Sequence, residues 1–228
     1  KSVTVPAGDL VYQDASRGLG LALDGKRFVE VKDFPHLTGR DKFSFTLWVS
    51  VADDTGGTLL SLMDDGDSRD KGLSLFVEKG RLHVNYGPRW LDDALRVQAR
   101  KPLVVGRWYH VAMTYDGSHK AAGLNLYVDG QLQPLQVGLD VFTGTFKTEY
   151  PLRLGSRGIA PHFRGQLDEV RFYRRELSGR EIQVVSVTET VAEIAGLQPA
   201  RRTAAQVEKI NEYFLRHVSP PEIRQAYL

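Results

Sequence analysis

One run of alternating residues decides the fold: Phe43-Ser44-Phe45-Thr46-Leu47-Trp48-Val49-Ser50-Val51, in which every odd position is apolar and most even positions are small or polar. A period of two is the signature of a β-strand with one face on a core. Similar alternation recurs over residues 73–77, 82–86, 109–115, 124–128 and 170–172. The chain from residue 20 to about 173 is therefore predicted to be a series of strands.

Turn residues separate these strands. Asp24-Gly25 and Asp129-Gly130 lie between alternating runs, and Lys79-Gly80 lies between two more. Asp-Gly in this position favours a two-residue hairpin, because a type I′ turn needs positive φ twice. About a dozen short strands without crossover helices exclude a parallel α/β fold and predict an all-β, antiparallel sandwich. A closed up-and-down barrel remains an alternative on periodicity alone.

The periodicity changes after Tyr173. Ser178 is placed to cap a short helix over 177–182, and the chain from about 189 to 228 has a helical pattern. Within it, Thr203 and Gln206 form a capping box. An apolar stripe follows at helical spacing, and a proline pair then ends the helix: Val207, Ile210, Phe214, Pro220, Pro221. We expect a β-sandwich over residues 1–185 and a short C-terminal helical appendage over 186–228.

Composition narrows the function classes. The 228 residues are 42% hydrophobic, enough for a full core, and include no cysteine. Thiol nucleophiles, iron–sulfur ligation, cysteine zinc sites and covalent c-type haem attachment are thereby excluded. A balance of 30 basic against 28 acidic residues predicts no nucleic-acid partner. No stretch approaches the roughly 18 apolar residues that a membrane span requires.

The two ends of the chain suggest a piece of a longer protein. It begins at Lys1 without a methionine or an apolar signal core, and it stops at Tyr227-Leu228 within a helical pattern. We therefore expect the appendage to lead into a further domain downstream.

Two segments carry a family resemblance. One is Gly106-Arg-Trp-Tyr-His-Val-Ala-Met-Thr-Tyr-Asp-Gly117, continuing to Leu126-Tyr-Val-Asp-Gly130; the other is Phe163-Arg-Gly-Gln-Leu-Asp-Glu-Val-Arg-Phe-Tyr173, ending at Leu177-Ser178. Over roughly residues 10–185 the chain resembles the laminin-G-like, concanavalin A-like jelly rolls. The resemblance implies a two-sheet jelly-roll sandwich.

Two shorter segments of the sequence resemble a narrower group of proteins. Residues 119–123 and the tail from 201 to 215 are similar to modules of large planctomycete proteins, which follow cytochrome-c-like domains and precede a second conserved domain. This resemblance implies an exported, extracytoplasmic (periplasmic or secreted) and non-catalytic module. It does not supply a ligand.

Glycoside hydrolysis is the least favoured function. It requires two carboxylates facing one cleft, and on a strand these must be an even number of positions apart. The relatives that catalyse it carry a Glu-x-Asp-x-x-Glu run, which this chain lacks. Asp168 and Glu169 are adjacent and point to opposite faces, so we expect Asp168 to stabilise a turn or to contact an arginine. His110, within a strand, is expected to pack in the interior rather than to bind a ligand.

An acidic loop over 64–70 has two interpretations. Hard cations such as calcium prefer clustered oxygen ligands, and this loop holds four carboxylates: Asp64, Asp65, Asp67 and Asp70. The spacing fails the EF-hand pattern, and a solvated hairpin tip is the alternative. No other cofactor is expected.

One tryptophan stands apart from the strand patterns. Trp48 and Trp108 lie within strands and are predicted to be core residues, whereas Trp90 lies in a Gly/Pro-containing stretch, 86–93, that is typical of a loop. Aromatic and arginine side chains dominate binding hot spots. The predicted ligand contacts are therefore Tyr86, Arg89, Trp90 and Asp92, with His83 and Asn85 on the outer sheet face beside them. The alternative is a Trp90 ring folded back over the sheet edge.

These observations predict a non-catalytic binding module that recognises a glycan or a protein surface within a larger exported protein. The alternative is an architectural spacer that positions the neighbouring domains of a cytochrome-type protein. The expected partners are a glycan or protein and the neighbouring domains of the parent chain.

Overall fold

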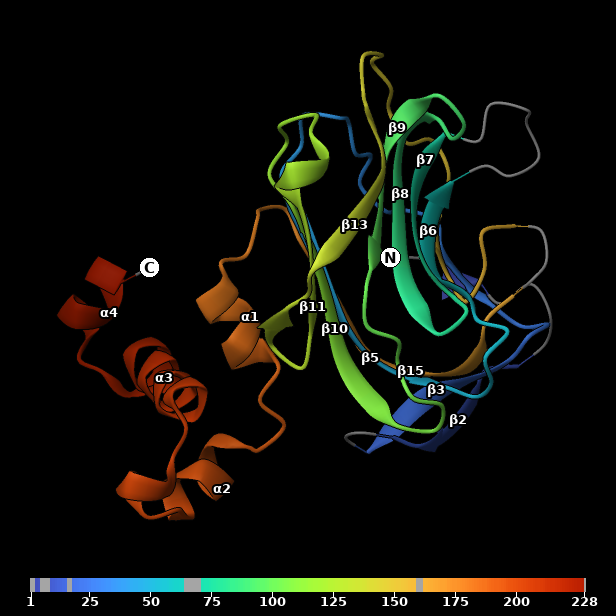
Figure 1. Cartoon of the computed structure of the whole chain (residues 1–228). Coiled ribbons are helices and arrows are strands. Elements are labelled where there is room, and N and C mark those ends of the chain that lie inside the picture. The colour runs from blue at the N-terminus through green and yellow to red at the C-terminus, as the bar shows by residue number, and fades with distance from the viewer. Residues whose placement is uncertain (1–2, 5–8, 16–17, 64–70, 159–161, 228) are drawn as a thin grey trace.

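The computed structural model describes residues 3–4, 9–15, 18–63, 71–158 and 162–227. Two antiparallel sheets pack face to face, and a helical part lies beside one of them (Figure 1). The predicted antiparallel sandwich is confirmed, and the open edges of both sheets rule out a single closed barrel. The helical pattern expected after residue 189 is confirmed as well.

Sheet A contains eight of the described strands. In spatial order they are β1 (Val3–Thr4), β4 (Val29–Val31), β14 (Leu152–Leu154), β6 (Gly57–Met63), β7 (Gly72–Glu78), β8 (Arg81–Arg89), β9 (Asp93–Ala99) and β13 (Leu135–Val141). Sheet B contains seven: β12 (Gln131–Leu132), β11 (Leu124–Val128), β10 (Trp108–Tyr115), β5 (Phe43–Val51), β15 (Arg164–Tyr173), β3 (Leu19–Asp24) and β2 (Val11–Asp14). Neither β1 nor β2 falls within the range predicted to be strands.

The core lies between the two sheets. Strand β5 occupies the middle of sheet B and directs Phe43, Phe45 and Leu47 inward, all at most 1% exposed. Sheet A meets them with inward residues such as Val84 and Tyr86, both completely buried. The alternation in the sequence of β5 therefore corresponds to the residues that it buries in the core.

Two of the three predicted hairpins are present. Lys79-Gly80 joins β7 to β8, and Asp129-Gly130 joins β11 to β12, each with positive φ at both residues. The Asp24-Gly25 hairpin is wrong, because β3 belongs to sheet B and β4 to sheet A, so the chain crosses between the layers there. The Asp24 carboxylate instead accepts hydrogen bonds from the Lys26 and Arg27 amides, which lowers its pKa to about 2.

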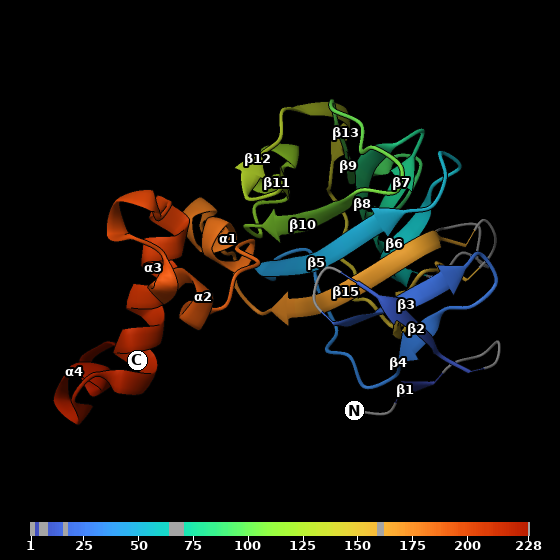
Figure 2. The ribbon, with the colours of Figure 1, turned by 90° about the horizontal axis from the view of Figure 1, so that it is seen from below.

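The helical part lies on the sheet B side of the sandwich, away from sheet A (Figures 1 and 2). It contains α1 (Gly179–Val185), α2 (Val191–Gly196), α3 (Ala204–Tyr213) and α4 (Pro221–Tyr227), with a π-helical turn over Phe214–Val218. The capping box at the start of α3 is confirmed, and α1 and α2 each begin with a capping box as well. Within the apolar stripe, Val207 and Phe214 are 40% and 48% exposed. No helix among the described residues is long and apolar enough to cross a membrane.

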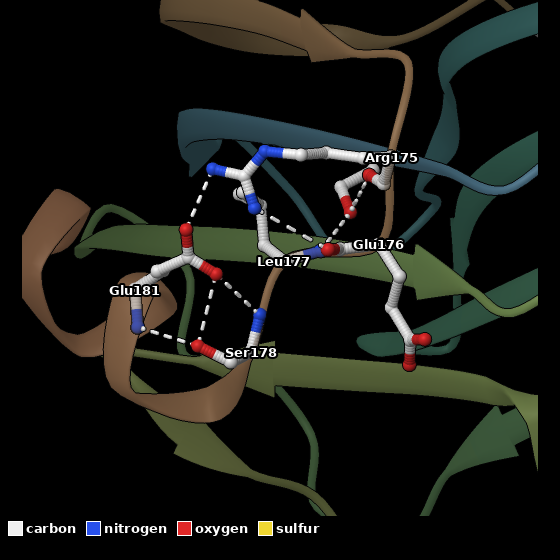
Figure 3. A network of polar contacts seen from close by, with 6 residues as sticks. Arg175, Glu176, Leu177, Ser178 and Glu181 are labelled. Carbon is white, nitrogen blue, oxygen red and sulfur yellow. Dashed lines mark hydrogen bonds and ion pairs between the residues drawn. The ribbon is translucent and has the colours of Figure 1, made fainter. Parts of the chain in front are cut away.

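A polar network joins β15 to α1 (Figure 3). The Ser44 hydroxyl on β5 donates to the Arg175 carbonyl and accepts from the Leu177 amide, both at 2.9 Å. Ser178 caps α1 as predicted, because its hydroxyl oxygen accepts from the Glu181 amide at 3.3 Å. In return the Ser178 amide and hydroxyl donate to the Glu181 carboxylate, whose other oxygen accepts from Arg175 at 2.6 Å. The start of the helical part is therefore fixed to the central strand of sheet B.

This network predicts a pH-dependent contribution to stability. The hydrogen bond from Arg175, followed by those from Ser178, lowers the pKa of Glu181 from 4.5 to about 2. The contribution is therefore complete above about pH 4.5 and is lost as the pH falls through about 2. We expect Glu181→Gln to reduce the free energy of unfolding at pH 7 by up to about 1 kcal/mol, the upper range for a solvent-screened pair. Urea unfolding at pH 7 and pH 2 checks this, and a difference that stays constant across that range would contradict it.

Candidate functional site

A row of side chains crosses the outer face of sheet A. The strand pairings place Thr58, Phe76, His83, Gln98 and Gln136 opposite one another on β6, β7, β8, β9 and β13. Their neighbours along each strand, such as Val77 and Val84, point into the core. Strand alternation thus gathers one aromatic ring, one imidazole and two amides on a single surface.

This row forms the floor of a cavity of about 450 Å³, which we call the sheet A pocket. That volume lies within the range of ordinary ligand sites. Its described lining also includes a tryptophan, two arginines and one carboxylate, and the side chains used below are Trp90, Arg96, Arg157 and Glu78.

Aromatic groups form one wall of the pocket. The Phe76 ring stacks on His83 with 4.9 Å between ring centres, and the Trp90 ring lies 5.9 Å from Phe76. Two cations lie over the indole ring: the guanidinium carbons of Arg157 and Arg96 are 4.9 and 5.8 Å from its centre. An apolar surface and fixed charges therefore converge at Trp90.

The remaining polar groups tune this surface. Arg96 donates from Nη2 to the Trp90 carbonyl, which ties the turn carrying the indole to β9. His83 lies 3.9 Å from the Glu78 carboxylate, yet burial lowers its pKa because it outweighs that attraction. His83 is therefore neutral at pH 7 and can both donate and accept a hydrogen bond.

A second polar row lies beside the first. Ser61, Ser74, Asn85 and Arg96 are opposite one another on β6 to β9, and the first three are at most 1% exposed. Ser61 donates to the Ser156 carbonyl. Within the described part of the chain, Ser74 Oγ, Asn85 Oδ1 and Arg96 Nε have no hydrogen-bond partner. Buried polar atoms of this kind are uncommon and often accompany a site for water or ligand.

Of the predicted ligand contacts, some line the sheet A pocket and others do not. Trp90 lines the pocket, with its ring partly buried against the sheet. His83 and Asn85 lie on the outer face, as predicted. Arg89 and Asp92 form an exposed ion pair at 2.9 Å and are not among the residues that line the pocket.

Tyr86 must be removed from the contact set. It is completely buried, its ring packs edge-on against Phe43, and its hydroxyl donates to the Thr38 carbonyl. The expected loop over 86–93 is mostly strand, because β8 continues to Arg89 and β9 begins at Asp93. Tyr86 therefore keeps the inward phase of β8.

Several residues that line the pocket were not among the ligand contacts predicted from the sequence. Phe76 occupies the outward phase of a strand whose inward residues are Leu75 and Val77, and an aromatic residue in that phase was a usable signal. Arg157 lies more than 60 residues from Trp90 along the chain, in the segment after β14. No local pattern connects it to the pocket.

The acidic loop predicted as a calcium site lies outside the described residues: Asp64, Asp65, Asp67 and Asp70. Elsewhere in the described chain, no group of three or more histidine, aspartate or glutamate side chains is arranged to hold a metal.

A second cavity, of about 380 Å³, lies between sheet B and the helical part. Trp48 lines it from the outer face of β5, so the prediction that Trp48 belongs to the core is wrong: as an even residue it has the outward phase. Trp108 is likewise only partly buried and outside the core. His110 is 2% exposed and packs edge-on against Trp48, which confirms that it is packed, although it lines this second cavity and is outside the core between the sheets. Burial, and then the charge of Arg171, lower its pKa to about 4.

Asp168 stabilises an irregularity within β15, where the sequence predicted a turn or a contact with an arginine. Its Oδ1 accepts from the Glu169 amide at 2.7 Å, and the register of β15 against β5 shifts between Asp168 and Arg171. Glu169 has a φ of 51° there and pairs with Arg171. Glu169 and Arg171, which both line the second cavity, therefore form an ion pair with each other.

Known structures share this architecture. Domain 4 of AbnA, an extracellular arabinanase from Geobacillus stearothermophilus solved with arabinotriose, is 19% identical with a TM-score of 0.54; the match covers 81% of this chain and 88% of that one. The binding domain of Paraclostridial Mosquitocidal Protein 1 is 15% identical with a TM-score of 0.62, over 81% and 47% of the two chains. A Trypanosoma rangeli sialidase is 19% identical with a TM-score of 0.55, over 81% and 29%. At these identities the likeness concerns the fold.

The chain spans about half of the binding-domain structure of the mosquitocidal protein and about three-tenths of the sialidase. No curated protein sequence matches it. One family model does match, over residues 23–183, which include nearly all of both sheets. This chain belongs to the concanavalin A-like lectin/glucanases superfamily.

Proposed function

We propose that this chain is a non-catalytic binding module that recognises a saccharide in the sheet A pocket. The observation that carries the proposal is the Trp90 indole, which forms a wall of a 450 Å³ cavity beside Phe76. Sugar rings present an apolar face of C–H groups that packs on aromatic rings, and their hydroxyls pair with planar polar groups. Gln98 and Gln136 supply such amides on the pocket floor.

The chemistry of the lining supports binding rather than hydrolysis. Glycosidases use two carboxyl groups roughly 5–9.5 Å apart. Among the described residues that line the pocket, Glu78 is the one carboxylate. It faces His83 rather than a second acid.

The likeness to binding domains supports the same proposal. The solved structures include the binding domains of a botulinum neurotoxin and a mosquitocidal protein, and an arabinanase domain in complex with arabinotriose. The arabinanase is named as an extracellular enzyme. We propose that this module belongs to an extracytoplasmic protein, in which it would attach neighbouring domains to a glycan.

Removing the indole should abolish binding. Loss of an interface hot spot costs about 2 kcal/mol or more, so we expect Trp90→Ala to weaken saccharide binding about 30-fold or more. A glycan array followed by titration calorimetry measures this. Leu91→Ala is the matched control, because Leu91 neighbours Trp90, is 82% exposed and is not among the pocket residues. A silent array with the folded wild-type chain would reject the proposal and favour the architectural spacer.

A further inference from the structure

We infer that the sheet A pocket selects saccharides that carry a carboxylate, such as uronic or sialic acids. This inference rests on the proposed function and specifies its ligand. It starts from the charges on the described lining, where Arg96 and Arg157 stand against the single acid Glu78. His83 is neutral, so the lining carries a net positive charge at pH 7.

Neither arginine is neutralised within the described part of the chain. Several other arginines of the described sandwich have acidic partners, including Arg153 with Glu30 at 2.9 Å and Arg164 with Asp53 at 3.3 Å. No such ion pair involves Arg96 or Arg157 among the described residues. Two permanently charged groups thus share a partly enclosed site without a counter-ion.

The arrangement of the two arginines suits an anion. Both guanidinium carbons lie over the Trp90 ring, within 5.8 Å of its centre, so both cations are held at the aromatic wall of the pocket. Arg96 is held by its bond to the Trp90 carbonyl, and its Nε is buried with no acceptor among the described residues. A guanidinium presents parallel N–H donors that match the two oxygens of a carboxylate.

The neutral groups favour a sugar acid over a simple anion. Thr58, Gln98 and Gln136 offer donors and acceptors to hydroxyls, and Phe76 offers an apolar surface. A small inorganic anion would use none of these. A pyranose with a carboxylate at its edge would use the amides, the aromatic wall and the arginines together.

The test compares matched acidic and neutral saccharides by titration calorimetry with the full chain. The pairs are an oligogalacturonide with its methyl ester, and sialyllactose with lactose, so the two arms also separate uronic from sialic acids. A charge-assisted hydrogen bond contributes about 1.5–3 kcal/mol, which corresponds to roughly 10- to 100-fold in affinity. We expect at least one acidic member to bind about 10-fold or more tightly than its neutral partner.

Variants assign this preference to the pocket. We expect Arg157→Gln to lower the affinity for the acidic sugar about 10-fold more than the affinity for its neutral partner, and Arg157→Lys to reduce this acid preference less. Arg180→Gln is the control: it removes the same charge from an exposed position on α1, on the other side of the sandwich. Circular dichroism and thermal melting establish that each variant is folded.

Two results would overturn the inference and are distinguishable from failure of the proposed function. If the neutral partners bind as tightly as the acids, or if Arg157→Gln retains the full acid preference, the carboxylate specificity is wrong and saccharide binding still stands. If no saccharide binds at all, the proposed function itself fails.

Discussion

Replacing Phe43 with alanine is expected to lower the free energy of unfolding by about 3–5 kcal/mol, the usual cost of emptying a buried phenylalanine site. Phe43 is completely buried, and its ring lies 5.3 Å from Tyr86 of sheet A and 5.5 Å from Tyr115 of sheet B. It therefore joins both layers. Urea unfolding should show a lower midpoint with an unchanged slope.

The control for this substitution is Val104→Ala. Val104 is 60% exposed, and substitutions at such positions usually change stability by less than about 0.5 kcal/mol. A loss below about 1 kcal/mol for Phe43→Ala would mean that the packing between the sheets differs from the arrangement described.

Gly56→Ala is expected to be comparably destabilising. Gly56 has a φ of +80°, which costs an alanine roughly 1–2 kcal/mol. A methyl group there would also lie 2.0 Å from the Val77 carbonyl oxygen on β7. Forcing packed groups apart adds about 1–3 kcal/mol, so we expect a total loss of about 2–5 kcal/mol. Thermal and urea unfolding measure it.

Substitutions at two other glycines distinguish the cost of the positive φ from the cost of the steric contact. Gly106 has a φ of +76° but open space around the added methyl, so Gly106→Ala should show the backbone cost alone, about 1–2 kcal/mol. Gly196, at the end of α2, has neither constraint, and Gly196→Ala should be neutral or stabilising by up to about 1 kcal/mol. Equal effects at all three positions would show that the contact with Val77 has no energetic consequence.

The parts of the fold that depend on neighbouring residues were predictable. Alternation along residues 43–51 identified the inward side chains of β5, and the Thr203 and Gln206 pair identified the start of α3. Both signals are local, since strand phase and helix capping are set by residues within a few positions of each other.

Features that depend on distant segments were not predictable in the same way. Asp24-Gly25 does form a turn, but turn chemistry cannot determine which sheet the next strand joins; that depends on β4 pairing with β14, more than 100 residues away. Trp48 was assigned to the core because it lies within a strand pattern, but its even position gives it the outward phase, and the helical part that covers this face is distant in the sequence.

The candidate site shows the same division. Trp90, His83 and Asn85 were found because one strand and the turn after it carry them. Arg96 and Arg157 come from β9 and from the segment after β14, and only the sheet order brings them to the same indole.

The placement of the helical part on sheet B has a practical consequence for measurement. Because Ser44 and the α1 network fix the start of the helical part to the layer opposite the sheet A pocket, a biotin attached at the exposed residue Gln225 of α4 would attach the molecule to a sensor surface from the side away from the pocket. The pocket would then face the flowing solution. A long polysaccharide could reach it without steric interference from the support.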